Sequence, residues 1–148
     1  MIKREKMVGF QLRTLNNLIK RDVEKSKNEI LGNSTGVHGW AIGYLYENSD
    51  REIFQKDFET HFSIRRSTAT KMLQLMEKNG LVIRVPVETD ARMKKIVLTE
   101  KAIDIHKKII KDIKDREKRL TQGVTKEELD IFFSVTNRIK ANLEENND

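Results

Sequence analysis

A run of basic and hydroxyl-bearing side chains is the part of this chain best equipped to bind a polyanion. Arginine can donate two parallel hydrogen bonds to the two major-groove acceptors of guanine, and short hydroxyls let the backbone come close to base edges and phosphates. Lysine is a point charge on a flexible stem, which suits a phosphate better. These properties predict contacts to nucleic acid, although an ordinary surface helix would also tolerate such residues. The run comprises Arg65, Arg66, Ser67, Thr68, Thr70 and Lys71.

A second basic group follows about twenty residues later. Arg92 could enter a minor groove, because a narrow groove concentrates negative potential. Asp90 could hold that guanidinium through a charge-assisted hydrogen bond, or the two could form only a local salt bridge in a turn. Lysines here could contact phosphates or simply protect the edge of a strand. The group comprises Arg84, Asp90, Arg92, Lys94 and Lys95.

Most of the net charge of the chain lies in the segment that contains both groups. The 148 residues include 29 basic and 23 acidic side chains, a net charge of +6. Residues 63–98 hold 8 basic and 3 acidic residues, whereas the segments before and after are nearly balanced. Release of counterions from phosphates favours such a concentration of charge. A solvated basic face is the alternative that charge alone would favour.

The elements around these residues can be read from the apolar pattern. Ser63 is placed to cap a helix that ends at Asn79-Gly80, since glycine suits the left-handed position after a helix. Residues Ala69, Met72, Leu73 and Met76 share one face of that helix, and the basic and hydroxyl residues lie largely on the other. Residues 81–87 and 94–98 read as two strands joined by a turn over 88–93, with Pro86 restricting the first to an edge or a strand end.

Helices are expected on both sides of this segment. The spacing of apolar residues predicts helices over 5–28, about 37–48, 53–62, 99–122 and 125–145, and Thr125 with Glu128 fits a capping box. The long terminal helices carry apolar stripes that could pack within one subunit or across a twofold axis. Sharing them in an isologous dimer is the simpler solution, because a small lobe offers them little surface.

Several classes of protein are excluded by what the sequence lacks. There is no cysteine, so disulfides, thiolate metal sites and a cysteine redox switch are ruled out. No apolar run reaches the roughly 18 residues of a membrane span, and the N-terminus lacks the apolar core of a signal peptide, which predicts a cytoplasmic protein. His38, His61 and His106 lack metal-ligand spacing and are expected at the surface or in caps. We expect no metal, no cofactor and no enzymatic activity, because no nucleophile–base pair or phosphate loop is visible.

Three segments together resemble the MarR family of transcriptional regulators. Residues 55–59 with 65–71 resemble its helix-turn-helix. Residues 75–84 resemble the junction between its recognition helix and the next strand. Asp90-Ala91-Arg92 with 97–102 resembles its wing and the entry to the following helix. The order of elements matches over the whole chain.

The resemblance implies a mainly α fold with a small β wing, a winged helix-turn-helix on a helical dimerisation base. Its order would be two helices, a short strand, two more helices, a two-stranded wing and two closing helices. Residues 1–30 and 99–148 would form the dimerisation region, and residues 34–98 the DNA-binding lobe. Ala91 stands where many members have a second basic residue, so the wing's minor-groove contact would rest on Arg92. Trp40 and Tyr44 are candidates for an effector pocket, although aromatics at helical spacing are more often core.

The resemblance also implies a function. The chain is expected to be a homodimer that binds a pseudo-palindromic operator in double-stranded DNA. It would act as a repressor released by a small aromatic or anionic effector. The alternatives are a winged helix that binds an acidic protein partner and a protein that binds DNA without sequence preference. Outward arginines on two separate elements favour DNA, because a protein-binding face would more often expose apolar residues.

Overall fold

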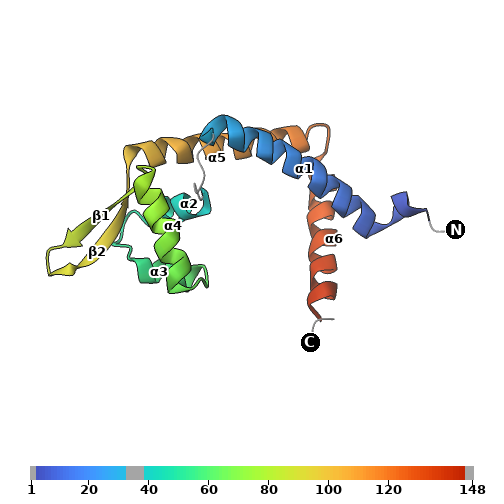
Figure 1. Cartoon of the computed structure of the whole chain (residues 1–148). Helices are drawn as coiled ribbons and strands as arrows, with labels where there is room; N and C mark the ends of the chain where they lie inside the picture. The colour runs from blue at the N-terminus through green and yellow to red at the C-terminus, as the bar shows by residue number, and fades with distance from the viewer. Residues whose placement is uncertain (1–2, 33–38, 146–148) are drawn as a thin grey trace. The chain divides into compact units, whose positions relative to one another are not determined.

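The computed structural model describes residues 3–32 and 39–145. It is mainly helical with a single two-stranded hairpin, as expected. A short 3-10 turn, Arg4–Lys6, precedes α1 (Val8–Leu31) (Figure 1). The remaining elements are α2 (Gly39–Glu47), α3 (Gln55–His61), α4 (Arg66–Lys78), β1 (Val82–Val87), β2 (Asp90–Leu98), α5 (Glu100–Leu120) and α6 (Lys126–Glu145).

A compact hydrophobic core joins α2, α3, α4, the hairpin and the start of α5. Phe58 of α3 and Leu73 of α4 are completely buried in it, next to Ile42 of α2. The face of α4 predicted to be apolar is confirmed, because all four of its members are buried: Ala69, Met72, Leu73 and Met76. The core fixes α4 by its inner side and leaves its outer side to solvent.

The turn between α3 and α4 differs from the prediction. Ser63 does not cap α4. It adopts a left-handed conformation with φ of 49°, and Arg65 occupies the N-cap position without a side-chain cap bond. The chain must reverse within a few residues here, and a left-handed residue achieves that reversal while Phe62 and Ile64 still pack on the core. The end of α4 is as predicted, with Gly80 at φ of 70°.

The hairpin is tighter than the sequence suggested. Val87 pairs with Asp90, so the turn consists of Glu88 and Thr89 rather than residues 88–93. The pairing shifts between Pro86 and Val87, because Pro86 pairs with Lys94 and the residues between Asp90 and Lys94 are extra on β2. Proline has no N–H to continue the ladder, which explains why the irregularity falls there. Arg92 therefore lies on a bulged strand and not in a loop.

Two further expectations were wrong in detail. The short strand expected before α3 is reduced to one main-chain hydrogen bond, in which the Ile96 N–H donates to the Ile53 carbonyl at 2.7 Å.

His106 is not a surface or capping residue. It is 7% exposed, on the same face of α5 as the buried Ala102, and its ring lies 4.4 Å from that of Tyr46. The imidazole packs against α2 at Gly43, where a Cβ would lie 3.8 Å from Cε1 of His106, an ordinary van der Waals distance. Residues 37 and 38, including His38, lie outside the described residues.

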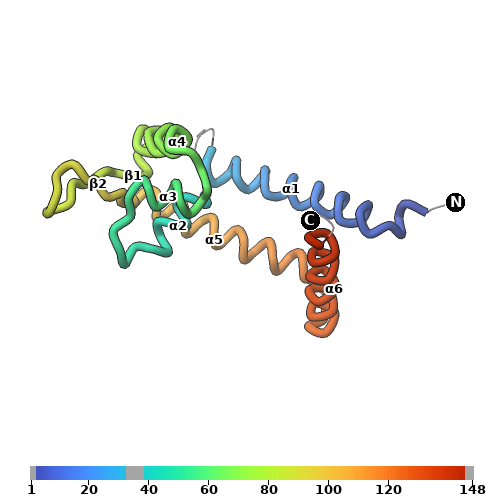
Figure 2. Tube along the Cα trace, turned by 90° about the horizontal axis from the view of Figure 1, so that it is seen from below, coloured from blue at the N-terminus to red at the C-terminus, as the bar shows by residue number. Residues whose placement is uncertain are grey.

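Neither α1 nor α6 has a buried residue, and each keeps an exposed apolar stripe. Both are unbroken helices (Figure 2). The capping box predicted at the start of α6 is confirmed: the Thr125 N–H donates to Oε2 of Glu128 at 2.8 Å, and the Glu128 N–H donates to Oγ1 of Thr125 at 3.2 Å. These helices are well formed, but in a single chain their apolar side chains are exposed to water.

Candidate nucleic-acid interface

The outer face of α4 carries cations that have no internal partner. Arg65, Arg66 and Lys71 are exposed, and none of them forms an ion pair with any described residue. Ser67 and Thr68, in the first turn of α4, are exposed beside them. The cations sit on a helix whose opposite face is fixed in the core, so they are available to a ligand and held by a rigid support.

Thr70 differs from the other hydroxyl residues of this face. It is half-buried, and its hydroxyl donates to the main-chain carbonyl of Arg66 at 2.8 Å. It also accepts a hydrogen bond of 2.9 Å from Nε2 of Gln55, the first residue of α3, and the same nitrogen lies 3.4 Å from the Arg66 carbonyl. Gln55 was not among the residues predicted to act at the DNA surface. No sequence pattern indicates that it reaches α4, because the contact depends on how the two helices cross.

On the hairpin, the basic residues divide into two kinds. Arg92 and Lys94 are exposed and make no ion pair among the described residues. Arg84 is paired with Glu77 of α4 at 3.5 Å, with its side chain 27% exposed, and Lys95 is paired with Glu52 at 3.7 Å. Part of the predicted basic surface is therefore neutralised within the chain.

Asp90 supports the backbone of the hairpin. Its Oδ1 accepts a hydrogen bond of 2.9 Å from the main-chain N–H of Arg92. No ion pair joins Asp90 to the Arg92 guanidinium in the described residues, so Asp90 shapes the bulged strand that carries Arg92 and leaves the charge free.

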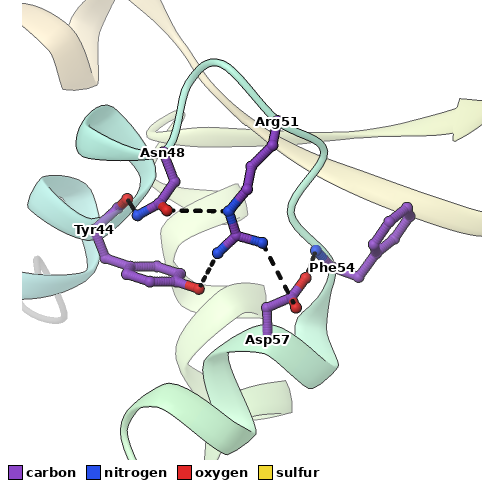
Figure 3. A network of polar contacts seen from close by, with 5 residues as sticks. All are labelled: Tyr44, Asn48, Arg51, Phe54 and Asp57. Atoms are coloured by element: carbon purple, nitrogen blue, oxygen red, sulfur yellow. Dashed lines mark hydrogen bonds and ion pairs between the residues drawn. The ribbon is translucent and has the colours of Figure 1, made fainter.

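A polar network around Arg51 ties α2 to α3 (Figure 3). The Arg51 guanidinium donates to the Tyr44 hydroxyl and to Oδ1 of Asn48, both at 3.0 Å, and lies 4.0 Å from Asp57. Asp57 in turn accepts from the Phe54 N–H at 2.7 Å, at the start of α3. This network fixes the helix from which Gln55 reaches α4, and sequence reasoning missed it because its members are ordinary polar residues.

The two aromatic candidates for an effector pocket are placed differently. Tyr44 is 8% exposed and belongs to the core, whereas Trp40 is 45% exposed and packs edge-on against Phe62 at 4.2 Å. Neither lines a cleft of about 410 Å³ formed by the end of α1, the α4–β1 junction and α5. Its lining residues are Ile30, Leu31, Asn79, Leu81, Lys101, Asp104, Ile105 and Lys108.

Comparison with known proteins agrees with this geometry. Residues 35–93 match the MarR family. The matched segment contains α2, α3, α4 and β1. The MarR-family proteins that this chain resembles are transcriptional regulators and not enzymes.

Individual relatives span almost the whole chain. An HTH-type transcriptional regulator of Bacillus subtilis strain 168, YybA, is 21% identical over 138 residues, 93% of this chain and 85% of that protein. The heme sensor PefR of Streptococcus agalactiae, solved with heme, is 25% identical with a TM-score of 0.72, covering 93% of this chain and 94% of PefR. The MepR–DNA complex of S. aureus shares the fold, with a TM-score of 0.76, 20% identity, and coverage of 91% of this chain and 98% of MepR.

None of the described helices combines the length and apolar character needed to cross a bilayer. Within the same residues, no three histidine, aspartate or glutamate side chains gather as a metal site would require.

Proposed function

We propose that this chain is a homodimeric repressor of the MarR family that binds a pseudo-palindromic operator in double-stranded DNA and is released by a small-molecule effector. The observation that carries the proposal is the outer face of α4, where Arg65, Arg66 and Lys71 are exposed around Ser67 and Thr68 and form no ion pair with any described residue. A helix with that face is suited to a major groove, where arginine can read guanine and lysine can contact phosphate.

The hairpin supplies a second contact in this proposal. Arg92 enters the neighbouring minor groove, and Lys94 binds a phosphate nearby. Arg84 and Lys95 contribute less, because each already has a carboxylate partner. Asp90 acts on the shape of the hairpin through its bond to the Arg92 main chain.

The terminal helices support a dimer. In α6, Phe132 and Phe133 are 50% and 55% exposed, and Leu12, Leu15 and Leu18 of α1 are also exposed. Apolar surface on this scale is stabilised by contact with an identical surface across a twofold axis. In this proposal residues 1–30 and 99–148 form the dimerisation region and residues 34–98 the DNA-binding lobe, of which 34–38 lie outside the described residues.

The cleft beside α5 is where we place the effector. Its lining includes apolar side chains, Ile30, Leu31, Leu81 and Ile105, and two lysines of α5, Lys101 and Lys108, with a single acid, Asp104, between them on the same helix. That combination suits a small aromatic or otherwise apolar molecule with a negative charge. PefR, a relative that binds heme, is a precedent for ligand sensing on this fold. The effector would act by binding one spacing of the two recognition helices more tightly than the spacing that fits DNA.

Selection from a random double-stranded DNA pool at moderate salt tests the DNA-binding part of the proposal. We expect enrichment of an inverted repeat with half-sites about ten base pairs apart, the distance between successive major grooves on one side of the duplex. Bulk binding that depends only on salt, without an enriched sequence, would contradict sequence-specific regulation.

Sedimentation equilibrium tests the dimer separately. Phe133→Asp should produce a monomer at micromolar concentration, because it puts a charge into the apolar stripe of α6. Ser134→Asp adds the same charge to the next position of the same helix, about 100° further round and away from the stripe, and should leave the dimer intact. A Phe133→Asp protein that stays dimeric would overturn this assignment of the interface.

A further inference from the structure

The Gln55–Thr70 contact carries an inference about which bases α4 selects, and it rests on the proposed function. Three groups meet where α3 crosses the start of α4. The Thr70 hydroxyl donates to the Arg66 carbonyl at 2.8 Å, and Nε2 of Gln55 donates to the Thr70 oxygen at 2.9 Å. The contact joins two helices at the edge of the face that also carries Arg66 and Lys71.

The hydrogen-bond inventory of these groups fixes their polarity. A hydroxyl has one proton to donate and two lone pairs to accept with. The single proton of Thr70 is used by the Arg66 carbonyl, and one lone pair is used by Gln55. Thr70 is therefore left with one lone pair, and it can accept a further hydrogen bond but cannot donate one.

The orientation of the Gln55 amide follows from its neighbours. Both atoms next to the amide, the Thr70 oxygen and the Arg66 carbonyl at 3.4 Å, are acceptors toward it. Only the NH2 end of the amide can face two acceptors, so its Oε1 is turned away from the pair. The free hydrogen-bonding groups at this point of the face are thus acceptors, whereas Arg65, Arg66 and Lys71 offer only donors.

We propose that Gln55, outside the recognition helix, is a positioning residue that holds Thr70 as a hydrogen-bond acceptor, so that Thr70 selects a base with a major-groove amino group. In the major groove only adenine and cytosine present an amino donor, at N6 and N4. Guanine and thymine present acceptor oxygens at the corresponding position, and these would repel the Thr70 lone pair. Phosphate oxygens are also acceptors, so Thr70 does not bind the DNA backbone.

Random-pool selection with wild-type protein and matched variants tests the proposal by the position of the effect. Wild type should require adenine or cytosine at one position of each half-site. Thr70→Val removes the acceptor at nearly constant volume, and it should abolish the preference at that position only. Gln55→Met should weaken the preference at the same position, because only the bond to the Arg66 carbonyl then orients the hydroxyl. The double variant should behave like Thr70→Val alone, since both changes act through one oxygen.

Thr68→Val is the matched control. Thr68 lies on the same helix, but among the described residues no hydrogen bond joins its hydroxyl to Gln55, so this variant should leave the adenine-or-cytosine position unchanged. Thermal unfolding of each variant checks that it folds. A variant in which the whole of α4 is displaced would bind every DNA sequence more weakly. It would not lose the base preference at one position of the half-site alone.

Base analogues provide a second measurement that needs no altered Thr70. Replacing the selected adenine by purine, or the selected cytosine by 2-pyrimidinone, removes only the amino group. Wild type should lose about fivefold in affinity, the effect of one neutral hydrogen bond.

Full affinity of wild type for the analogue operator would overturn the proposal, as would variants of Thr70 and Gln55 that lose the base preference at different positions. Failure of wild type to enrich any sequence would overturn the proposed function and this inference with it. An enriched inverted repeat without such a position would overturn only the inference.

Discussion

Helix α4, the proposed recognition helix, and the hairpin β1–β2 are both basic, but their charges are partnered differently. On α4, Arg65, Arg66 and Lys71 have no ion-pair partner among the described residues. On the hairpin, Arg84 and Lys95 are held by Glu77 and Glu52. The hairpin therefore presents Arg92 and Lys94 as its free cations, at and beside the bulge.

The difference shows that a basic residue has to be judged by the acids within reach of it. Each half-exposed pair contributes only about 0–1 kcal/mol to stability, so its importance lies elsewhere. A paired guanidinium must give up its carboxylate before it can bind a phosphate, which lowers the net gain from DNA. We therefore expect the same substitution to have a large effect on α4, a smaller one at the bulge, and little effect at the paired positions.

The largest effect is expected from Arg66→Ala on α4. Loss of a bidentate contact to guanine should weaken operator binding by about 1–3 kcal/mol for each half-site and relax the base preference there. Fluorescence anisotropy with the selected operator measures the affinity. Lys78→Ala is the control, because it removes the same charge from the last turn of the same helix. Equal losses for the two variants would mean that α4 contributes only charge, and the distinction between reading helix and supporting hairpin would disappear.

The hairpin itself is tested by comparing Arg92→Ala with Arg84→Ala. Arg92→Ala should weaken operator binding by about 1 kcal/mol without changing the dimer, since one minor-groove arginine is lost. Arg84→Ala should change affinity by less than about 0.5 kcal/mol, because its charge is already balanced by Glu77. Binding titrations at one salt concentration decide between them. If Arg84→Ala is the more damaging change, the ion pair opens in the complex and the division of the hairpin into free and paired cations is wrong.

Salt dependence sharpens the comparison for the two lysines. Lys94→Ala should lower the slope of log affinity against log salt by about 1, as expected when one phosphate contact is removed. Lys95→Ala should leave the slope nearly unchanged, because Lys95 is paired with Glu52. The slopes are measured from about 50 to 300 mM salt, a range over which such contacts weaken strongly. Equal slopes for both variants would show that the Glu52 pair does not withhold Lys95 from DNA.

These contrasts also mark what the sequence could predict. The buried face of α4, the position of Gly80 and the capping box of α6 depend on local spacing and local chemistry, and the structure confirms them. The pairs Arg84–Glu77 and Lys95–Glu52 depend on how the elements pack against each other, so the charge pattern alone could not separate free cations from paired ones.

The same limit explains the residues that were missed or misplaced. Gln55 reaches Thr70, and Arg51 joins Tyr44 to Asp57, only because α2, α3 and α4 meet in the fold. His106 was expected at the surface or in a cap because the histidines lack metal-ligand spacing, but the helical repeat places it one turn after the buried Ala102. Polar residues in the interior are hard to find from sequence, because their type resembles that of the surface.

The smallest effect is expected at Ser63, in the turn before α4. The hairpin has no non-glycine residue with a positive φ. Ser63 is the single non-glycine residue with a positive φ in the described part of the chain. A left-handed conformation is unfavourable for a residue with a Cβ. Glycine avoids that strain, although it loses more backbone entropy on folding than serine does. Ser63→Gly should therefore raise the free energy of unfolding by about 0.5–1 kcal/mol, seen as a small increase in Tm. Ser67→Gly, inside the first turn of α4, should lower the free energy of unfolding by a similar amount, because glycine is unfavourable in a helix.

Operator affinity of Ser63→Gly should stay within about twofold of wild type, since Leu73 and the Gln55–Thr70 contact hold α4 independently of the turn. A stabilised protein with much weaker DNA binding would show instead that the strained serine, and not the core, sets the position of the recognition helix.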